Sequence, residues 1–171
     1  MINLNSIDNN EFKVSVEFNG DHYYFITLFD YGLWLPDYTL DPIVLTKEAE
    51  AIDLGASLKK AFSRSETMGR KNSYIFDHLE NKINYENDIK KRMALDGYKN
   101  KKAFFKNMRH CGVSQVNDLI TIRPSNHVKL EAWSGECISE TDWVIIPASA
   151  SDEELGHAII EGFSRCRGRQ F

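Results

Sequence analysis

The sequence predicts a single α+β domain with a mainly antiparallel or mixed sheet. Three observations lead to this prediction. Stretches of alternating apolar and polar residues, typical of half-buried strands, occur in both the first and the last third of the chain. Stretches with apolar residues at helical spacing follow them. A strand-and-helix pattern also occurs twice, with a helical stretch in between. At 171 residues, the chain is long enough for one core and too short for two ordinary domains.

The first part of the chain predicts a hairpin, a short strand and a helix. Residues 12–18 alternate, and Asn19-Gly20 supplies a turn because both residues tolerate positive φ. Residues 22–29 form the returning strand, and residues 31–42, with one glycine and two prolines, form a loop. Residues 43–45 are a short apolar strand, after which helical spacing begins.

The middle of the chain predicts helices. The first has a loose apolar stripe made of Ile75, Leu79, Ile83 and Ile89. After the break at Asp96-Gly97, a second helix is expected from Lys99 to Cys111, ending at Gly112 because glycine is common just beyond a helix C-terminus. Its apolar residues Phe104, Met108 and Cys111 are at helical spacing.

The last third again predicts strands followed by a helix. Strands are expected at residues 116–122, 127–133 and 144–146. A helix is expected at residues 151–165, where Ser151 and Glu154 have the spacing of a capping box.

Residues 43–65 align without a gap on residues 144–166, at a shift of 101. The alignment has six identities in 23 positions, where ordinary composition gives about one or two. Upstream, Ile26-Thr27-Leu28 is similar to Ile120-Thr121-Ile122 if a gap is allowed. We therefore predict two half-repeats, at about 12–65 and 114–166, separated by a helical insert at about 73–111.

The repeated residues have structural explanations. Leucine or isoleucine and phenylalanine at four-residue spacing make an apolar stripe, and glycine beside the first leucine allows close packing. Arginine in the last turn favours the negative end of the helix dipole. The alternative, a repeated active-site arginine at Arg64 and Arg165, is weaker because a functional charge needs a cleft.

Composition and motifs exclude several classes of protein. The sequence has no signal peptide pattern and no run of about 20 apolar residues, so no membrane span is expected. It lacks the GxSxG, P-loop, GxGxxG and HExxH motifs, and its five histidines are scattered. The three cysteines (Cys111, Cys137 and Cys166) form no CxxC, which favours reduced, buried thiols over a disulfide framework or a zinc site. We expect no catalytic residue, metal or cofactor.

Charge is unevenly distributed along the chain. The overall net charge is −4, but residues 1–56 hold ten acidic and two basic residues, and residues 57–110 hold fourteen basic and six acidic ones. The basic residues between Lys90 and Arg109, with Phe104 and Phe105 among them, allow a nucleic-acid-binding face as an alternative function. The overall pI of about 5.7 favours a solvated helix face instead.

The acidic first third offers a candidate partner-binding site. It combines carboxylates with aromatic residues, a composition that suits a protein interface with a basic partner. The candidate residues are Asp30, Trp34, Asp37, Tyr38, Asp41, Glu48 and Glu50. The structural alternative, in which Trp34 packs on the sheet and the carboxylates only keep the surface soluble, is equally consistent with the sequence.

Several short motifs resemble a known family. They are Tyr98–Met108 followed by Cys111, Ile120-Thr121-Ile122, Val144-Ile145-Ile146-Pro147, and the Leu-Gly pairs Leu54-Gly55 and Leu155-Gly156 in helices that end in Ser-Arg. Together they resemble the immunity proteins of bacterial contact-dependent growth inhibition (CDI) systems, over about residues 40–166. Residues before about 40 match no motif of that family.

The resemblance implies a function without catalysis. Such immunity proteins are cytoplasmic, and each binds the C-terminal domain of a toxin delivered by a neighbouring cell and blocks its active site. Many of those toxins are nucleases with basic substrate clefts, which an acidic surface would complement. The resemblance does not identify interface residues, because interfaces vary with the cognate toxin.

Overall fold

The computed structural model describes residues 11–68 and 77–168. Its strands are β1 (Glu11–Phe18), β2 (His22–Asp30), β3 (Trp34–Pro36), β4 (Ile43–Thr46), β5 (Arg109–Val116), β6 (Leu119–Pro124), β7 (Asn126–Lys129), β8 (Ala132–Ser134), β9 (Val144–Pro147) and β10 (Arg167–Gly168). Its helices are α1 (Ala51–Met68), α2 (His78–Asp96), α3 (Lys101–Phe105) and α4 (Asp152–Ser164), with a 3-10 turn η2 (Glu140–Asp142). The mixture of helices and mainly antiparallel strands confirms the predicted α+β class.

The larger sheet is antiparallel, and its two central strands, β1 and β5, come from different halves of the chain. Its order is β3-β2-β1-β5-β6-β9, and β4 also pairs with β2. At the centre β1 runs beside β5, with Val14 opposite Val113. Each central strand turns back into its own hairpin partner, β1 into β2 and β5 into β6. The two halves of the chain therefore meet along the β1–β5 ladder.

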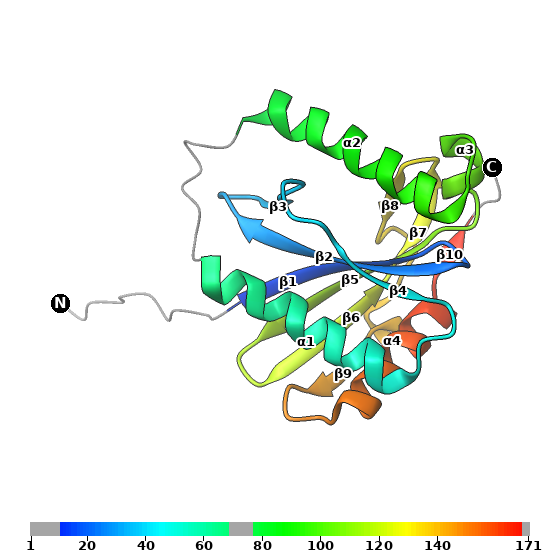
Figure 1. Ribbon diagram of the computed structural model, residues 1–171. Helices are drawn as coiled ribbons and strands as arrows, with labels where there is room; N and C mark the ends of the chain where they lie inside the picture. The colour runs from blue at the N-terminus through cyan, green and yellow to red at the C-terminus, as the bar shows by residue number, and fades with distance from the viewer. Residues whose placement is uncertain (1–10, 69–76, 169–171) are drawn as a thin grey trace.

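The main core lies between this sheet and the helices α1 and α4, which cover one face (Figure 1). Because side chains alternate along a strand, Val14 and Val16 of β1 point to the same face as Val113 of β5. Leu58 of α1 and Ile159 of α4 pack against them and are fully buried. This apolar contact accounts for the period-2 and helical patterns in both halves.

A second, smaller core lies on the opposite face of the sheet. There α2 and α3 cover Tyr24, together with Ile89, Phe104, Phe105 and Met108. In Figure 1 these two helices lie above the sheet, and α1 and α4 lie below it. A small sheet in the order β10-β7-β8 joins the second core at its side, through Trp133. The helical insert thus completes a third layer.

Equivalent residues of the two halves make equivalent contacts. Arg64 at the end of α1 donates to the Asp41 carbonyl at 2.8 Å, and Arg165 after α4 donates to the Asp142 carbonyl at 3.0 Å. Both pairs are related by the shift of 101. Each arginine therefore ties the end of its helix to the segment before the short strand β4 or β9, a structural role.

The helices α1 and α4 approach each other through two glycines. A Cβ at Gly55 would lie 1.8 Å from the Asp152 carbonyl oxygen, and a Cβ at Gly156 would lie 1.7 Å from the Ala51 carbonyl oxygen. Ala51 and Asp152 are themselves related by the shift of 101. The close approach is therefore reciprocal, and only glycine permits it at either position.

Three predicted elements are wrong, and one of them, the strand expected at 127–133, is the β7–β8 hairpin. The helix expected from Lys99 to Cys111 ends at Phe105, and Cys111 and Gly112 lie in the central strand β5. Phe104, Met108 and Cys111 are all buried as expected, but on different elements, because pairing with β1 and β6 overrides the helical spacing. The strand expected at 116–122 is instead a hairpin, with its turn at Asn117, which has a φ of 51°.

Three smaller expectations also change. The stripe on α2 does not hold, because Leu79 and Ile83 are 70% and 54% exposed while Ile89 is buried; Ile75 lies outside the described residues. The loop expected at 31–42 contains the short strand β3. The strand pairings align residues 23–25, not 26–28, with residues 120–122, because Phe25 lies opposite Ile43 just as Ile122 lies opposite Val144.

Candidate partner-binding surface

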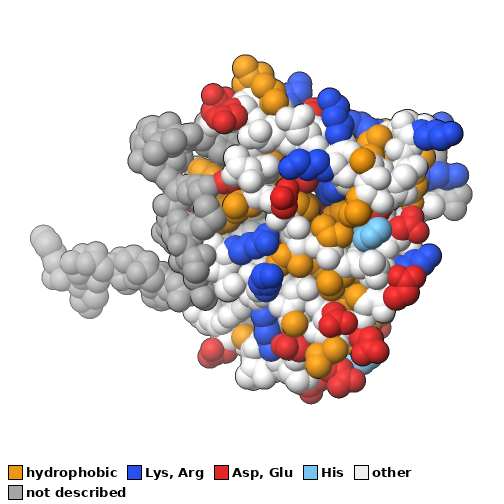
Figure 2. All heavy atoms as spheres, in the orientation of Figure 1, with side chains coloured by type: hydrophobic (Ala, Val, Ile, Leu, Met, Phe, Trp, Pro, Cys, Tyr) orange, Lys and Arg blue, Asp and Glu red, His pale blue; other side chains and the backbone are white. Residues whose placement is uncertain are grey.

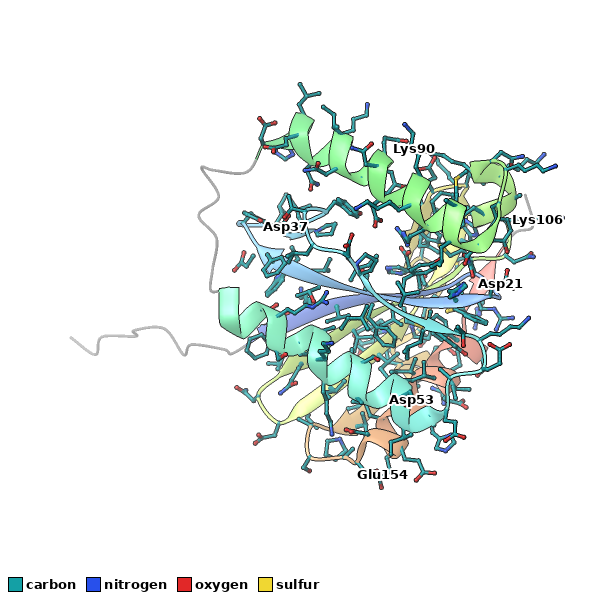
Figure 3. The ribbon with its side chains drawn as sticks, in the orientation of Figure 1. Asp21, Asp37, Asp53, Lys90, Lys106 and Glu154 are labelled. Atoms are coloured by element: carbon teal, nitrogen blue, oxygen red, sulfur yellow. The ribbon has the colours of Figure 1, made fainter. Side chains whose placement is uncertain are left out.

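The structure places the seven predicted partner-binding residues in two groups. Asp30 and Trp34 face each other at the far end of the β2–β3 pair, and Asp37, Tyr38 and Asp41 follow in the segment that leads to β4. Glu48 and Glu50 lie beyond β4, whose last residue pairs with the first residue of β2. Asp30 and Trp34 are thus at the opposite end of β2 from Glu48 and Glu50, about 25 Å along the strand at the usual rise per residue, while Asp41 lies nearer the middle, two residues before the Ile43–Phe25 pair. Figure 3 shows this separation between Asp37 and Asp53, whose carboxylate accepts from the Glu50 amide.

The first group sits on a loop that is ordered by its own polar side chains. Asp30 Oδ1 accepts from the Gly32 amide at 2.9 Å, and Asp37 Oδ1 accepts from the Thr39 amide at 3.0 Å. Such turns are the local preference of aspartate, which explains why the segments on either side of β3 hold a defined shape. The Asp41 side chain is 80% exposed and lies 3.2 Å from Lys91 of α2. We name residues 30–41 the acidic loop.

Aromatic contacts join the acidic loop to α2. The Tyr38 ring lies 5.2 Å from the Tyr85 ring, and the Tyr85 hydroxyl donates to Glu131 at 2.6 Å. Lys101 bridges Glu131 and Glu86, at 3.1 and 2.9 Å. Burial raises the pKa of Tyr38, and burial together with the Glu131 hydrogen bond raises that of Tyr85. Both phenols are protonated at neutral pH, and the Tyr85 hydroxyl is the donor to Glu131.

Between α2 and the sheet, next to Tyr38, is a cleft of about 420 Å³. Its lining includes His78, Asn81, Lys82 and Tyr85 from α2, Tyr38 from the acidic loop, and Glu131 and Trp133 from the small sheet. The floor holds a buried ion-pair cluster in which Arg92 lies 2.7 Å from Glu17 and 2.9 Å from Asp88. The Arg92 guanidinium also stacks 4.7 Å above the Tyr24 ring. This cluster fixes α2 over the sheet and so shapes the cleft.

Exposed apolar side chains border the same region. Leu33, at the turn between β2 and β3, is 69% exposed, and Leu79 and Ile83 are on α2. Trp34 lies on the sheet face that α1 and α4 do not cover, with the Lys13 ammonium 5.1 Å from its ring centre. Exposed apolar residues beside carboxylates and tyrosines are typical of a protein-binding surface.

The second group belongs to a different acidic region. Glu48 and Glu50 precede α1, and Asp152, Glu153 and Glu154 begin α4 beside it. Acidic side chains gather at the lower right of Figure 2, over the beginnings of these helices. Carboxylates at helix N-termini are stabilised by the helix dipole, and hydrogen bonds within the Ser151 capping box lower the pKa of Glu154. A structural explanation is therefore available for this group.

The basic face considered for nucleic acid is divided by the fold. Arg92 is buried, Lys91 pairs with Asp41, and Lys101 pairs with two glutamates. Phe104 and Phe105 are in the second core and are inaccessible to bases. The exposed cations of this run are Lys90, Lys91, Lys99, Lys102, Lys106 and Arg109, which are spread from α2 to the start of β5. The structure thus weakens the nucleic-acid alternative.

The histidines make structural contacts. His127 stacks on Trp133 with ring centres 4.8 Å apart, and His110 stacks on the same indole at 5.6 Å. Burial lowers the pKa of His110, which favours the neutral ring. Within residues 11–68 and 77–168, no group of three or more His, Cys, Asp or Glu residues is arranged to hold a metal ion. In the same ranges, no helix is both long enough and apolar enough to cross a membrane.

Sequence reasoning missed the part of the surface that comes from α2 and the small sheet. Tyr85 and Glu131 are 46 residues apart and meet only because α2 folds back over the sheet. Neither residue belongs to a recognisable motif. The one available signal is the concentration of aromatic and charged residues in the helical insert, which is also consistent with a solvated helix face.

Comparison with known proteins gives consistent results. A model of the family described as CDI immunity protein (CdiI) matches residues 12–166. The immunity protein CdiI-YPIII of Yersinia pseudotuberculosis serotype O:3 is 32% identical over 146 residues, covering 75% of this chain and 82% of that protein.

Two solved structures share the fold. A Neisseria meningitidis protein of unknown function has a TM-score of 0.82 at 28% identity, covering 93% of this chain and 97% of its own. A chain from a CdiA-CT/CdiI toxin and immunity complex of Yersinia pseudotuberculosis also has a TM-score of 0.82 at 28% identity, covering 92% of this chain and 98% of its own.

Proposed function

The chain belongs to the CDI immunity protein family, and from this membership we propose that it binds and neutralises a cognate toxin domain. The observation that carries the proposal is the likeness, over nearly the whole chain, to a protein solved in a complex of toxin and immunity protein. The proposed mechanism needs no catalysis, because covering the active site of the toxin is enough to stop it. The proposed place of action is the bacterial cytoplasm.

We propose that the toxin contacts the acidic loop and the neighbouring half of α2. Three features support this choice. The loop presents carboxylates in a defined shape, the cleft beside it can receive a side chain of the partner, and Leu33, Leu79 and Ile83 offer exposed apolar surface. A basic toxin cleft, such as that of a nuclease, would complement the carboxylates and associate rapidly.

Charge reversal tests the surface. Asp37→Lys and Asp41→Lys should each weaken binding to the cognate toxin domain by about tenfold, mainly through slower association. Asp37→Asn is the matched control for loop shape, because it keeps the oxygen that Thr39 contacts and removes only the charge. Affinities and rates can be measured by surface plasmon resonance, with inhibition of toxin activity as a second readout.

The second acidic group provides the internal comparison. Glu48→Lys and Glu50→Lys should leave binding unchanged if the acidic loop is the contact surface. Weakened binding in these two variants alone would move the interface to the beginning of α1. Absence of a complex between the unaltered protein and its cognate toxin would remove the function itself, whatever the variants do.

A further inference from the structure

Two thiols touch each other outside the proposed toxin-binding surface. Cys111 lies in the central strand β5 and is buried, and Cys166 follows the end of α4. Their sulfur atoms are 3.6 Å apart. The Cys166 Sγ also lies 3.4 Å from the His110 carbonyl oxygen, so its position is fixed by the strand beside it. Only a small movement separates this contact from a disulfide bond.

Solvent reaches one of the two thiols through a cleft. Cys166 lines a cleft of about 280 Å³, and Cys111 is not part of its lining. Three cationic residues line the same cleft, Lys106, Arg109 and Arg167, of which Arg167 also lies 3.5 Å from the Asp142 carboxylate. Its other lining residues are Asn107, Met108, His127 and Gly168, none of which is acidic. The cleft is therefore suited to a small anionic molecule that reacts at Cys166.

The surroundings also favour the thiolate at Cys166. The hydrogen bond with Cys111 lowers the pKa of Cys166 to about 7, and the Arg109 charge acts in the same direction, while burial opposes both. The same hydrogen bond, together with burial, raises the pKa of Cys111. The accessible thiol is thus the better nucleophile, and the buried thiol is held protonated behind it.

We propose that Cys166 and Cys111 form a thiol–disulfide exchange site for small disulfides that carry carboxylates, with glutathione disulfide as the representative. In the first step the Cys166 thiolate attacks one sulfur of the disulfide. The bond between the two glutathione sulfurs breaks, one glutathione leaves as a thiolate and takes up a proton, and a mixed disulfide remains on Cys166.

In the second step Cys111 loses its proton to solvent and its sulfur attacks the Cys166 sulfur. The mixed disulfide breaks, the second glutathione leaves and is protonated, and a bond forms between Cys111 and Cys166. The two protein thiols are oxidised by two electrons, and one glutathione disulfide is reduced to two glutathiones. The product would link β5 covalently to the segment that continues into β10.

Mass spectrometry after incubation with glutathione disulfide tests the site. The unaltered protein should lose two hydrogens, with peptide mapping locating the new bond between Cys111 and Cys166. Cys111→Ala should stop at the mixed disulfide and gain one glutathionyl group on Cys166. Cys166→Ala should form neither product at these positions. Modification confined to Cys137, or no trapped adduct in Cys111→Ala, would overturn the proposal.

The chain supplies its own control for simple exposure. Cys137 is the exposed cysteine, so a reaction governed by access alone would occur there first. Cys137→Ser should leave the rate of the Cys111–Cys166 reaction unchanged. Circular dichroism and urea unfolding of each variant check that the fold is retained. If an alanine variant unfolds, peptide mapping of folded Cys137→Ser still tests the proposal, because this variant keeps both Cys111 and Cys166.

Two rate comparisons test the chemistry of the ligand. Glutathione disulfide should react at least about tenfold faster than the cationic disulfide cystamine at low salt, because the cleft is cationic. The pH dependence of the first step should have its midpoint near 7, since the thiolate fraction rises through the lowered pKa of Cys166 and levels off above it. Equal rates for the two disulfides, or a midpoint no lower than that of an ordinary thiol, would contradict the proposal.

Discussion

Arg92 lies in a run of three basic residues, Lys90-Lys91-Arg92, but its side chain is only 4% exposed, whereas Lys90 and Lys91 are on the surface. It lies between Glu17 of β1 and Asp88 on its own helix, with its guanidinium over Tyr24. Burial alone would lower the pKa of Arg92, but the charges of Glu17 and Asp88 more than compensate and raise it. The arginine is therefore permanently charged, and both carboxylates depend on it.

Removing this charge should destabilise the protein strongly. Arg92→Met keeps much of the side-chain length but leaves two carboxylates buried without a cation, which should lower the free energy of unfolding by about 3–5 kcal/mol. Urea unfolding followed by circular dichroism measures the change. Lys90→Ala, on the exposed side of the same helix, should change it by less than about 0.5 kcal/mol. Equal stability of the two variants would show that the cluster does not hold α2 in place.

Residue-scale predictions from sequence succeeded where the residue's surroundings are local. The Ser151 capping box is present as predicted, because its partner is three residues away. Arg92 could not be recognised as buried, because Glu17 is 75 residues distant and reaches it through the fold. The same applies to Cys166, whose partner Cys111 comes from another strand.

At the scale of elements, the packing of α1 on α4 depends on two glycines in equivalent positions. Each glycine lies against the first turn of the other helix. The backbone of Asp152 occupies the space that a side chain at Gly55 would need, and the backbone of Ala51 does the same at Gly156. Because the neighbouring atoms belong to the backbone, they cannot move aside as a flexible side chain could. The helices would have to separate, and Leu54 and Leu155 beside them would lose their packing.

A single methyl group at either position should therefore be costly. Gly55→Ala and Gly156→Ala should each lower the free energy of unfolding by about 3 kcal/mol or more, the upper end for overpacked sites. Gly135→Ala is the matched control, since a Cβ there meets no atom within 4 Å. Thermal and urea unfolding compare the three variants. A small effect at one glycine and a large one at the other would show that the two contacts are not equivalent in energy.

The sequence predicted most elements but misplaced those in the centre of the sheet. Strands β1, β2, β4 and β9 and helices α1 and α4 lie close to their expected positions, because each has a strong pattern and clear end signals. The sequence predicts a helix that extends into the start of β5, since Cys111 also fits the helical spacing of Phe104 and Met108. Only pairing with β1 and β6 decides between the two, and pairing is not a local property.

At the scale of the whole molecule, the two faces of the sheet differ in how completely they are covered. One face is closed by α1 and α4, which make up the main core. The other is only partly covered, and α2, the acidic loop and the small sheet surround the cleft there. The proposed contact surface therefore combines α2 of the helical insert with the acidic loop of the first half-repeat, on the face opposite α1 and α4 (Figure 1).

The proposed function predicts a salt-dependent association with the toxin. The association rate constant should fall about tenfold between roughly 0.05 and 0.5 M NaCl, while the dissociation rate changes less, since salt screens steering over long distances. The double variant Asp37→Lys/Asp41→Lys should show a shallower dependence. Stopped-flow fluorescence gives both constants. A rate that does not respond to salt would mean that the acidic loop does not steer the encounter.

Only half of the candidate surface could be found in the sequence. Residues 30–41 could be identified from the sequence because they are contiguous and their composition is unusual for a loop. The part of the surface on α2 could not be identified, because the helix carries no motif and its orientation depends on Arg92 and the second core. Glu48 and Glu50 were grouped with the loop by sequence distance, and the fold separates them along the length of β2.

The reciprocal glycine contact has the form of a symmetric dimer interface, in which residue i of one subunit touches residue j of the other and the reverse also holds. In a real homodimer every substitution is made twice, so a change that improves one binding surface also alters its copy. Here both halves belong to one chain, and each can change alone. The half-repeat that carries the acidic loop, the proposed contact surface, can therefore change in sequence without a matching change in the other half.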